Sequence, residues 1–280
     1  MLALVRNGYV TGAYGLRIDG LGEQETLRVQ GGGDWPPVTV QFRAGKSSGA
    51  EREVGPDRAL MPLYETELHM SREERRAVFV TERDFTVEEV VHPYLAPVAV
   101  VFARWDRRET LHAGAFVAGD GAWALLGEKT AGKSTTLAWL AEHGSDIVAD
   151  DIVVLSDGCA LAGPRCLDVR DDASAYLEAG TPASMPREGG RNRVVLPPLR
   201  SQVPLRGIVY LEWGERTAVE RVPAGQRIER LVVQRQGASI HNDPVDVLDL
   251  AALPALVLTR PRGLDALDHA GGALREAVSA

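Results

Sequence analysis

The sequence has 280 residues, with 31 Lys and Arg against 39 Asp and Glu for a net charge of −8, and its length suggests about two domains or one large one. The acidic balance argues against a nucleic-acid binder, two Cys make no disulfide framework, and no apolar stretch approaches the roughly 20 residues of a membrane-spanning helix. Arg6 and Asn7 interrupt the first apolar run, so no export signal is predicted, and we expect a cytoplasmic protein without nucleic-acid or membrane partners.

Residues 1–108 are predicted to form a β-rich N-terminal domain, in which short β-like runs alternate with Gly-rich turns. The clearest runs are residues 9–16, 25–29 and 38–42. Ser71 and Glu74 have the spacing of a capping box, which predicts that a helix begins there. Residues 90–103 are mostly apolar but contain two Pro, and His92 before the first of them is assigned a structural role.

From Glu109 onward strands and helices alternate, which predicts an α/β domain over residues 109–280. The expected strands are residues 111–117, 122–126, 147–154, 207–213 and 255–259. The expected helices are residues 130–141, 244–252 and 264–277. Gly144 is expected to end the first of these helices. Residues 181–206 contain five Arg and five Pro and are predicted to form a loop or a lid.

Residues 127–134, GEKTAGKS, match the phosphate-binding Walker A pattern G-x-x-x-x-G-K-[ST] in full. An apolar strand is expected before this P-loop and a helix after it, which is the context the motif requires. Lys133 is then expected to reach the β- and γ-phosphates of a nucleotide, and Ser134 to bind Mg²⁺. Only three residues of the chain are Lys, and two of them, Lys129 and Lys133, lie in this loop. A compact ammonium is hard to replace by Arg at a phosphate site.

Asp150 and Asp151 follow Lys133 closely and lie within the apolar run 147–154. Adjacent carboxylates inside a buried strand are costly unless they are paired or bind a metal. Neighbouring side chains on a strand point to opposite faces, so one Asp would face the phosphates and the other a second metal or an Arg. The alternative is that the strand ends there in a turn with both carboxylates solvated.

His112 opens the strand before the P-loop strand, and Gly119, Asp120 and Gly121 predict a hairpin turn between the two. An antiparallel hairpin would bring His112 toward Gly127, beside the transferred phosphate. The alternative is a core or surface His without a role in the chemistry.

Arginines gather downstream of the Asp pair and after the last expected strand. Several could converge on nucleotide phosphates or on an acidic peptide, and one could stabilise the transition state. Gly163 and Pro164 fix the turn before Arg165 and Arg170, which are therefore preferred, with Arg165 as the catalytic candidate. The alternative for any one of them is a solvated side chain. The arginines downstream of the Asp pair are Arg165, Arg170, Arg187, Arg191 and Arg193, and those after the last expected strand are Arg260 and Arg262.

The order of these motifs resembles the catalytic domain of HPr kinase/phosphorylase: a His-Ala-Gly strand, a P-loop ending in GKS, a short helix, a Gly and an Asp-Asp pair. The close resemblance covers residues 109–156, and residues 1–108 do not resemble the N-terminal domain of that enzyme. It implies an α/β (α+β) P-loop kinase domain similar to the nucleotide domain of phosphoenolpyruvate carboxykinase, preceded here by a smaller β-rich domain.

The resemblance also implies roles for individual residues. ATP would be held by Gly127, Glu128, Lys129, Thr130, Ala131, Gly132, Lys133, Ser134 and Thr135. Ser134 would hold Mg²⁺ with one Asp of the pair, assigned as Asp151. The other, Asp150, would accept the proton of the attacking hydroxyl, with His112 close to it.

The acidic, Gly-rich signature that serves phosphorolysis in the HPr enzymes is absent after the Asp pair, which argues against phosphorylase activity and against HPr as the acceptor. The whole pattern is more similar to the HPr kinase-related proteins of peptide natural-product clusters, including kinases of lasso precursor peptides. We therefore predict an ATP- and Mg²⁺-dependent kinase of a hydroxyl, a Ser, on a peptide or small protein.

The N-terminal domain would recognise that acceptor or mediate assembly into a homo-oligomer. A small-molecule kinase of the same fold and a nucleotide-sensing regulator without transfer activity are the alternatives, and the P-loop does not decide between ATP and GTP.

Overall fold

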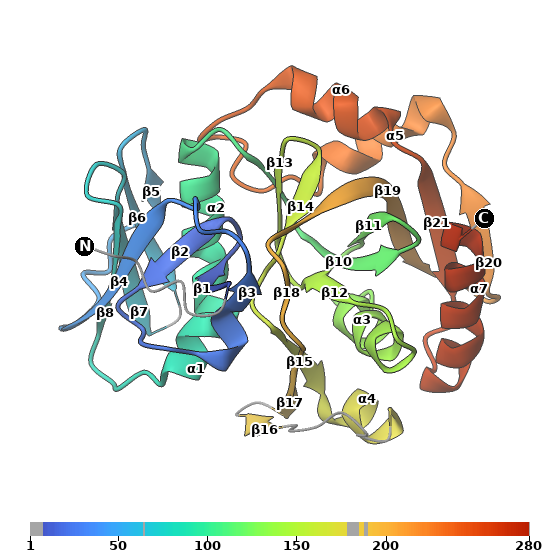
Figure 1. The fold of residues 1–280 in the computed structure, drawn as a ribbon, viewed down its shortest axis with the longest axis horizontal. Coiled ribbons are helices and arrows are strands. Elements are labelled where there is room, and N and C mark those ends of the chain that lie inside the picture. The colour runs from blue at the N-terminus through green and yellow to red at the C-terminus, as the bar shows by residue number, and fades with distance from the viewer. Residues whose placement is uncertain (1–7, 64, 178–184, 188–189, 280) are drawn as a thin grey trace.

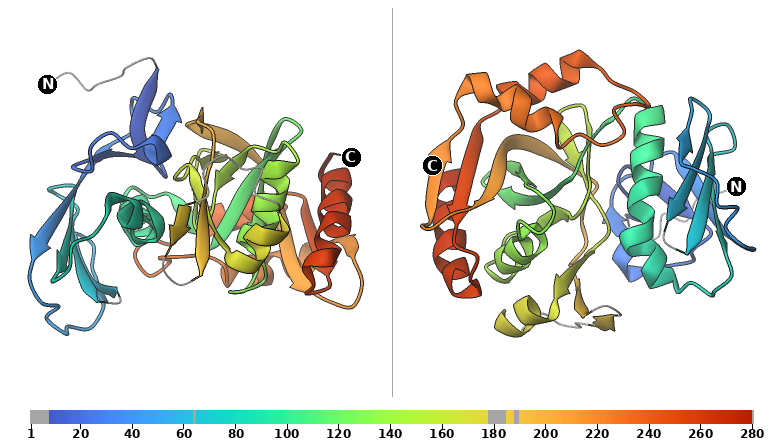
Figure 2. Two further views of the ribbon diagram at one scale, coloured as in Figure 1. Left: turned by 90° about the horizontal axis from the view of Figure 1, so that it is seen from below. Right: turned by 180° about the vertical axis from the view of Figure 1, so that it is seen from behind.

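A computed structural model describes residues 8–63, 65–177, 185–187 and 190–279. Two large sheets lie side by side, and helix α2 (Leu95–Trp105) runs between them (Figure 1). Helix α2 is buried along nearly its whole length, including Val98 and Phe102, because both sheets cover it. The views in Figure 2 show the same order of layers.

The first sheet contains nine strands in the order β18-β3-β1-β2-β4-β8-β7-β6-β5. They are β1 (Tyr9–Ala13), β2 (Leu16–Asp19), β3 (Arg28–Gln30), β4 (Pro37–Ala44), β5 (Glu53–Val54), β6 (Arg58–Leu63), β7 (Thr66–Ser71), β8 (Arg76–Thr81) and β18 (Leu199–Arg200). The strand expected over 38–42 is confirmed within β4. The run 9–16 is a strand only to Ala13, because Tyr14 and Gly15, both with positive φ, turn the chain into β2. In the run 25–29, η1 (Glu25–Leu27) occupies the start. Strand β18 comes from the second half of the chain and pairs with β3. The domain boundary after residue 108 stays a prediction.

The helix predicted to begin at Ser71 is wrong, because Ser71 ends β7 and Arg76 begins β8 in an antiparallel hairpin. The hydroxyl of Ser71 accepts a hydrogen bond from the Glu74 N–H at 3.3 Å, as a helix-capping Ser would. Arg75, with φ of 47°, then turns the chain back. The same local hydrogen bond serves a helix cap and a hairpin turn, so the pattern could not separate them.

The apolar segment 90–103 is helical, in two pieces. A single turn, α1 (Val87–Glu89), is capped by Thr86, and η2 (Val90–Tyr94) follows it. His92 has extended backbone angles, φ −154° and ψ 123°, so the chain bends there before α2 begins. Because of this bend, the His92 side chain approaches Asp151 and Asp168 in the second half of the chain.

The second sheet has the order β12-β10-β11-β19-β14-β13-β9, with β21 beside β19 and β20 beside β21. Its strands are β9 (Glu109–Leu111), β10 (Ala113–Ala118), β11 (Gly121–Leu126), β12 (Ile147–Ala149), β13 (Val153–Ser156), β14 (Cys159–Leu161), β19 (Gln202–Trp213), β20 (Ala218–Arg221) and β21 (Ala255–Arg260). Alternate side chains face opposite ways: Leu125 and Val209 pack with α3 (Lys133–Glu142) and α7 (Leu267–Ser279). Leu126 and Ile208 face α2, α5 (Ala224–Val232) and α6 (Pro244–Ala252).

The helices predicted over 130–141, 244–252 and 264–277 are confirmed as α3, α6 and the pair η3 (Leu264–Ala266) and α7. Gly144, with φ of 86°, follows the end of α3 as expected. No helix in the described part of the chain is both long and apolar enough to cross a membrane.

A third, three-stranded sheet in the order β15-β17-β16 lies beside α3 (Figure 1). It consists of β15 (Cys166–Arg170), β16 (Met185–Arg187) and β17 (Arg191–Val195), with α4 (Asp171–Tyr176) after β15. The loop or lid predicted over 181–206 is therefore wrong at residues 185–187, which form β16, and from residue 191 onward, where β17, β18 and β19 follow one another. Residues 181–184 and 188–189 lie outside the described residues. The many Arg and Pro residues of this segment suggest a loop. Its few apolar residues, such as Val194 and Val203, are nevertheless buried in strands.

Glu109, the first residue of β9, is a buried carboxylate between two arginines. Arg104 from α2 donates to one of its oxygens, and Nε of Arg235 donates to the other at 2.9 Å. Nε of Arg104 also donates to the main-chain oxygen of Gln236 at 2.7 Å. This cluster joins α2, β9 and the segment after α5.

Replacing Glu109 by Ala should destabilise the protein by about 3–5 kcal/mol, because two buried guanidinium groups would lose their shared carboxylate. Urea unfolding followed by circular dichroism measures this change. The control Asp120→Asn removes an ion pair with Arg206 in which both side chains are largely exposed, and should cost at most about 1 kcal/mol. Equal losses in the two variants would contradict the role given to the Glu109 cluster.

Candidate functional site

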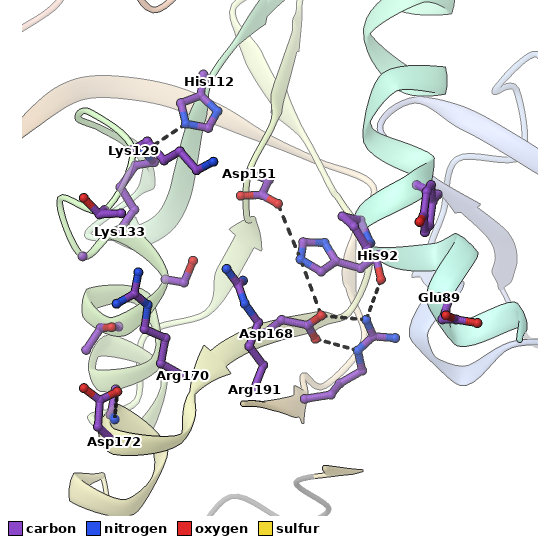
Figure 3. Close-up of a pocket in the computed structure, with 18 of the residues that line it drawn as sticks. Glu89, His92, His112, Lys129, Lys133, Asp151, Asp168, Arg170, Asp172 and Arg191 are labelled. Carbon is purple, nitrogen blue, oxygen red and sulfur yellow. Dashed lines mark hydrogen bonds and ion pairs between the residues drawn. The ribbon is translucent and has the colours of Figure 1, made fainter. Parts of the chain in front are cut away.

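A cavity of about 1360 Å³ opens where several segments of the chain meet (Figure 3). One wall is the loop between β11 and α3 with the first turn of α3, and residues 83–94 before α2 form the opposite wall. The remaining lining comes from His112, Asp151, the ends of β15 and β17, and the segments at the ends of β19 and β21. Eight of the lining residues are Lys or Arg and six are Asp or Glu. The cavity is therefore net basic in a chain that is net acidic.

The predicted P-loop connects β11 to α3, and both Thr130 and Gly132 in it have positive φ, 71° and 90°. A Cβ at Gly132 would lie 2.3 Å from Nη2 of Arg260, so a larger residue would displace that side chain. Helix α3 begins at Lys133, which sets its free N–H groups and the positive end of its dipole at the cavity. The predicted nucleotide-binding residues that line the cavity are Lys129, Thr130, Gly132, Lys133, Ser134 and Thr135. Those that do not are Gly127, Glu128 and Ala131.

The ammonium group of Lys133 is held against the loop and against His112. Nζ of Lys133 lies 2.7 Å from the carbonyl oxygen of Gly127 and 3.1 Å from Nε2 of His112. The predicted hairpin of β10 and β11 is confirmed, and its register sets Ala113 opposite Leu126, which carries His112 to the loop. Burial, and then the charge of Lys133, lowers the pKa of His112. A neutral His112 can accept a hydrogen bond from the ammonium at Nε2.

The preferred prediction places Asp150 and Asp151 inside one strand, and the structure corrects it. Strand β12 ends at Ala149 and β13 begins at Val153, and Asp151 between them has φ of 64°. The Ile152 N–H donates to the carbonyl oxygen of Asp150 at 2.8 Å, which closes a tight turn. Asp150 is 3% exposed, whereas the Asp151 side chain is 39% exposed and lines the cavity. The predicted alternative, a strand-end turn, is confirmed for the backbone, but only one of the two carboxylates is solvated.

Asp150 lies beneath the cavity and accepts a hydrogen bond from the side chain of Ser134. Burial, and then the charge of Asp151, raises the pKa of Asp150 to about 6, against the opposing effects of His92 and Ser134. The hydroxyl of Tyr14 in the first sheet donates to the main-chain oxygen of Asp150 at 3.2 Å. The adjacent Ser134 and Asp150 oxygens suit Mg²⁺, which takes few protein ligands and completes its shell with water and phosphates. Among the described residues, no group of three or more His, Cys, Asp or Glu is arranged to hold a metal.

A network around Asp168 joins the two halves of the chain at the cavity. Nε and Nη2 of Arg193 donate to the two carboxylate oxygens of Asp168 at 2.8 and 3.0 Å. Arg193 also donates to the main-chain oxygens of Glu88 and His92, at 2.6 and 2.9 Å. Nε2 of His92 lies 3.5 Å from Oδ2 of Asp151 and 3.8 Å from Oδ2 of Asp168. His92, to which the sequence assigns a structural role, therefore lines the cavity. No local sequence pattern indicates this position.

Arg165, the predicted catalytic arginine, is not part of the cavity lining. Its side chain is 1% exposed, its Nε donates to the carbonyl oxygen of Pro197 at 2.9 Å, and burial lowers its pKa to about 10. Arg165 joins segments beneath the site, so the geometry corrects the prediction that it reaches the phosphates. Of the other predicted arginines, Arg170, Arg191 and Arg193 line the cavity. The side chain of Arg187 lies outside the described residues.

Arg260, at the end of β21, is a buried cation at the P-loop. It is 1% exposed, lies 4.4 Å above the ring of Trp213, and burial lowers its pKa. Its Nε has no hydrogen-bond partner in the described structure. A buried guanidinium without an acidic partner is costly, and a phosphate group would relieve that cost. Arg262 lies at the same ring, 5.6 Å away, and both arginines line the cavity. Their contact with a nucleotide or substrate stays a prediction.

No family model matches the chain, and no curated protein matches it. Among solved structures, the Hpr(Ser) kinase/phosphatase from Coxiella burnetii is similar at a TM-score of 0.33 and 12% identity, covering 60% of this chain and 89% of that chain. A likeness at this level establishes neither a family nor an activity.

Asp150→Asn should stabilise the protein at about pH 8 and have little effect below about pH 4. The pKa of Asp150 in the folded state is about 6, above its ordinary 3.8, so the native state binds the proton more tightly and ionisation costs stability as the pH rises through this window. The difference between these two pKa values corresponds to about 3 kcal/mol in the free energy of unfolding, which Asp150→Asn should gain at about pH 8.

Urea unfolding with a chelator present measures the gain at both pH values. The exposed control Asp249→Asn should change stability little at either pH. The shift of Asp150 is contradicted if its Asn variant gains nothing at the higher pH.

Proposed function

We propose that the protein is a phosphotransferase that binds ATP with Mg²⁺ in this cavity and transfers the γ-phosphate to a hydroxyl, a Ser, of a peptide or small protein. The observation that carries the proposal is the convergence of Lys133, Ser134 and Asp151 on one cavity at the start of α3. Phosphoryl transfer needs a positioned cation for the phosphate oxygens and a carboxylate that orients the attacking hydroxyl.

On the phosphate side, Lys133 would exchange the carbonyl oxygen of Gly127 for the β- and γ-phosphate oxygens, with neutral His112 holding its ammonium in place. Arg260 would supply a second, desolvated positive charge at the loop. Mg²⁺, when bound, would neutralise charge on the phosphate oxygens, with the Ser134 hydroxyl and the Asp150 carboxylate as its protein ligands.

On the acceptor side, we assign the general base to Asp151 and the metal ligand to Asp150, the reverse of the sequence prediction. The base must touch the acceptor in open space, and Asp151 lines the cavity while Asp150 is buried against Ser134. The acceptor hydroxyl would give its proton to Oδ1 of Asp151 while its oxygen bonds to the γ-phosphorus and ADP leaves. His92, 3.5 Å from Oδ2, would hold the carboxylate in orientation.

The size and walls of the cavity support a peptide acceptor. Its volume of about 1360 Å³ exceeds the roughly 300–1,000 Å³ of pockets for single drug-sized ligands, so a nucleotide and a peptide segment could share it. One wall, residues 83–94, belongs to the half of the chain outside the P-loop unit. This supports a contribution of that half to acceptor recognition.

Lys133→Ala should abolish the stabilisation of the protein by Mg²⁺-ATP, because the variant lacks the cation for the phosphates. Ligand at about 100 times its dissociation constant stabilises by about 2.7 kcal/mol, which a thermal-shift titration detects. The exposed Lys46 supplies the matched control Lys46→Ala, which should keep the full shift. The nucleotide site is refuted if Mg²⁺-ATP, Mg²⁺-GTP and Mg²⁺-ADP all fail to stabilise the wild type.

Asp151→Asn should lower phosphate transfer by about a hundredfold or more while Mg²⁺-ADP still binds, since it removes only the proton acceptor. Asp150→Asn should instead raise the Mg²⁺ concentration needed for activity. Intact-mass detection of phosphate added to serine peptides, together with phosphate release from ATP to water, measures both. If transfer survives in Asp151→Asn and fails at all Mg²⁺ concentrations in Asp150→Asn, the original assignment of the base to Asp150 is correct.

A further inference from the structure

Two arginines face each other at the cavity end of the small sheet. In the antiparallel register of β15 and β17, Arg170 pairs with Arg191, and both side chains are exposed and line the cavity. In Figure 3 both extend from the sheet into the space between the P-loop lysines and the pair His92 and Asp168. Like charges directly opposite on a sheet are destabilising, so this pair calls for an anion.

The acidic side chains near this pair make other interactions. Asp168, two register pairs along on the same face, receives two hydrogen bonds from Arg193. Oδ1 of Asp172 accepts the Ala173 N–H at 2.8 Å, and Oδ1 of Asp171 accepts from Asn192 at 2.8 Å. Within the described residues, Arg170 and Arg191 have no ion pair of their own. Their charges are therefore available to a ligand.

The position of the pair favours the acceptor over the nucleotide. The phosphates have their own cations on the P-loop wall, in Lys133 and Arg260. Arg170 and Arg191 belong to a different sheet, two register pairs from Asp168. Asp168 lies 3.8 Å from His92, which also approaches Asp151. An anion bound there lies on the side of the cavity where the proposed base meets the acceptor hydroxyl.

We infer that Arg170 and Arg191 bind a carboxylate group of the acceptor, close to the hydroxyl that is phosphorylated. Guanidinium groups match the planar carboxylate with two parallel hydrogen bonds, and two of them can hold one carboxylate from both sides. The acceptor is then an acidic peptide, whose carboxylate is either a side chain or a free C-terminus. The assignment of this ligand as the phosphate acceptor rests on the proposed function, but the anion site itself does not.

Fluorescence anisotropy of labelled serine hexapeptides, without nucleotide, tests the site directly. One probe alternates Ser and Glu and has an amidated C-terminus; a second alternates Ser and Gln with a free C-terminal carboxylate; a third has Gln and an amidated C-terminus. The wild type should bind the first or the second about tenfold or more tightly than the third, and which of the two identifies the source of the carboxylate.

The variants Arg170→Gln and Arg191→Gln should each remove most of this preference without changing the thermal shift by Mg²⁺-ADP. The control Arg221→Gln, at an exposed strand position outside the cavity, should keep it. The inference is overturned if wild type shows no preference for either carboxylate peptide, if both Gln variants retain the preference, or if they weaken Mg²⁺-ADP binding and leave peptide binding unchanged. If the wild type binds no nucleotide, the proposed function is refuted. The peptide-binding test of Arg170 and Arg191 is unaffected, because it is run without nucleotide.

Discussion

The two hydrogen bonds between Arg193 and Asp168 hold the site together. Both side chains are buried, and the remaining donors of Arg193 bind the main chain at Glu88 and His92. Breaking such a pair would leave a buried charge. The bonds of Arg193 to Glu88 and His92 tie the small sheet to the segment before α2. Arg193 keeps His92 near Asp151. Because Asp168 is bound to Arg193, Arg170 and Arg191 have no acidic partner among the described residues.

A single backbone conformation gives the two adjacent aspartates different environments. The left-handed angles of Asp151 end β12 and let β13 join a different part of the sheet. One carboxylate is thereby buried beside Ser134 with a raised pKa, and the other is solvated in the cavity. Non-Gly residues pay a cost for such angles, and they persist where the surrounding structure holds them. Here Tyr14 of the first sheet supplies part of that support by binding the main chain of Asp150.

The cationic side chains of the cavity also differ in their burial. The chain is acidic overall, yet its cavity is lined by more cationic than anionic side chains. Those cations belong to different surroundings: Lys133 and Arg260 are buried at the P-loop, whereas Arg170 and Arg191 are exposed at the sheet end. Buried cations without carboxylate partners favour a bound anion strongly, because desolvation has already been imposed by folding. The exposed pair, Arg170 and Arg191, is where we propose that a carboxylate of the acceptor binds.

The sequence by itself determined the features that depend on neighbours within about twenty residues: the P-loop between a strand and a helix, the hairpin that returns His112, and the stop at Gly144. Turn residues and hydrophobic periodicity are local, so they can be recognised in the chain. Only the tertiary structure decided that Arg165 is buried, that Arg193 binds Asp168, and that His92 faces Asp151. Those contacts join residues 25, 32 and 59 positions apart, and what brings them together is the packing of sheets around α2, which no local pattern encodes.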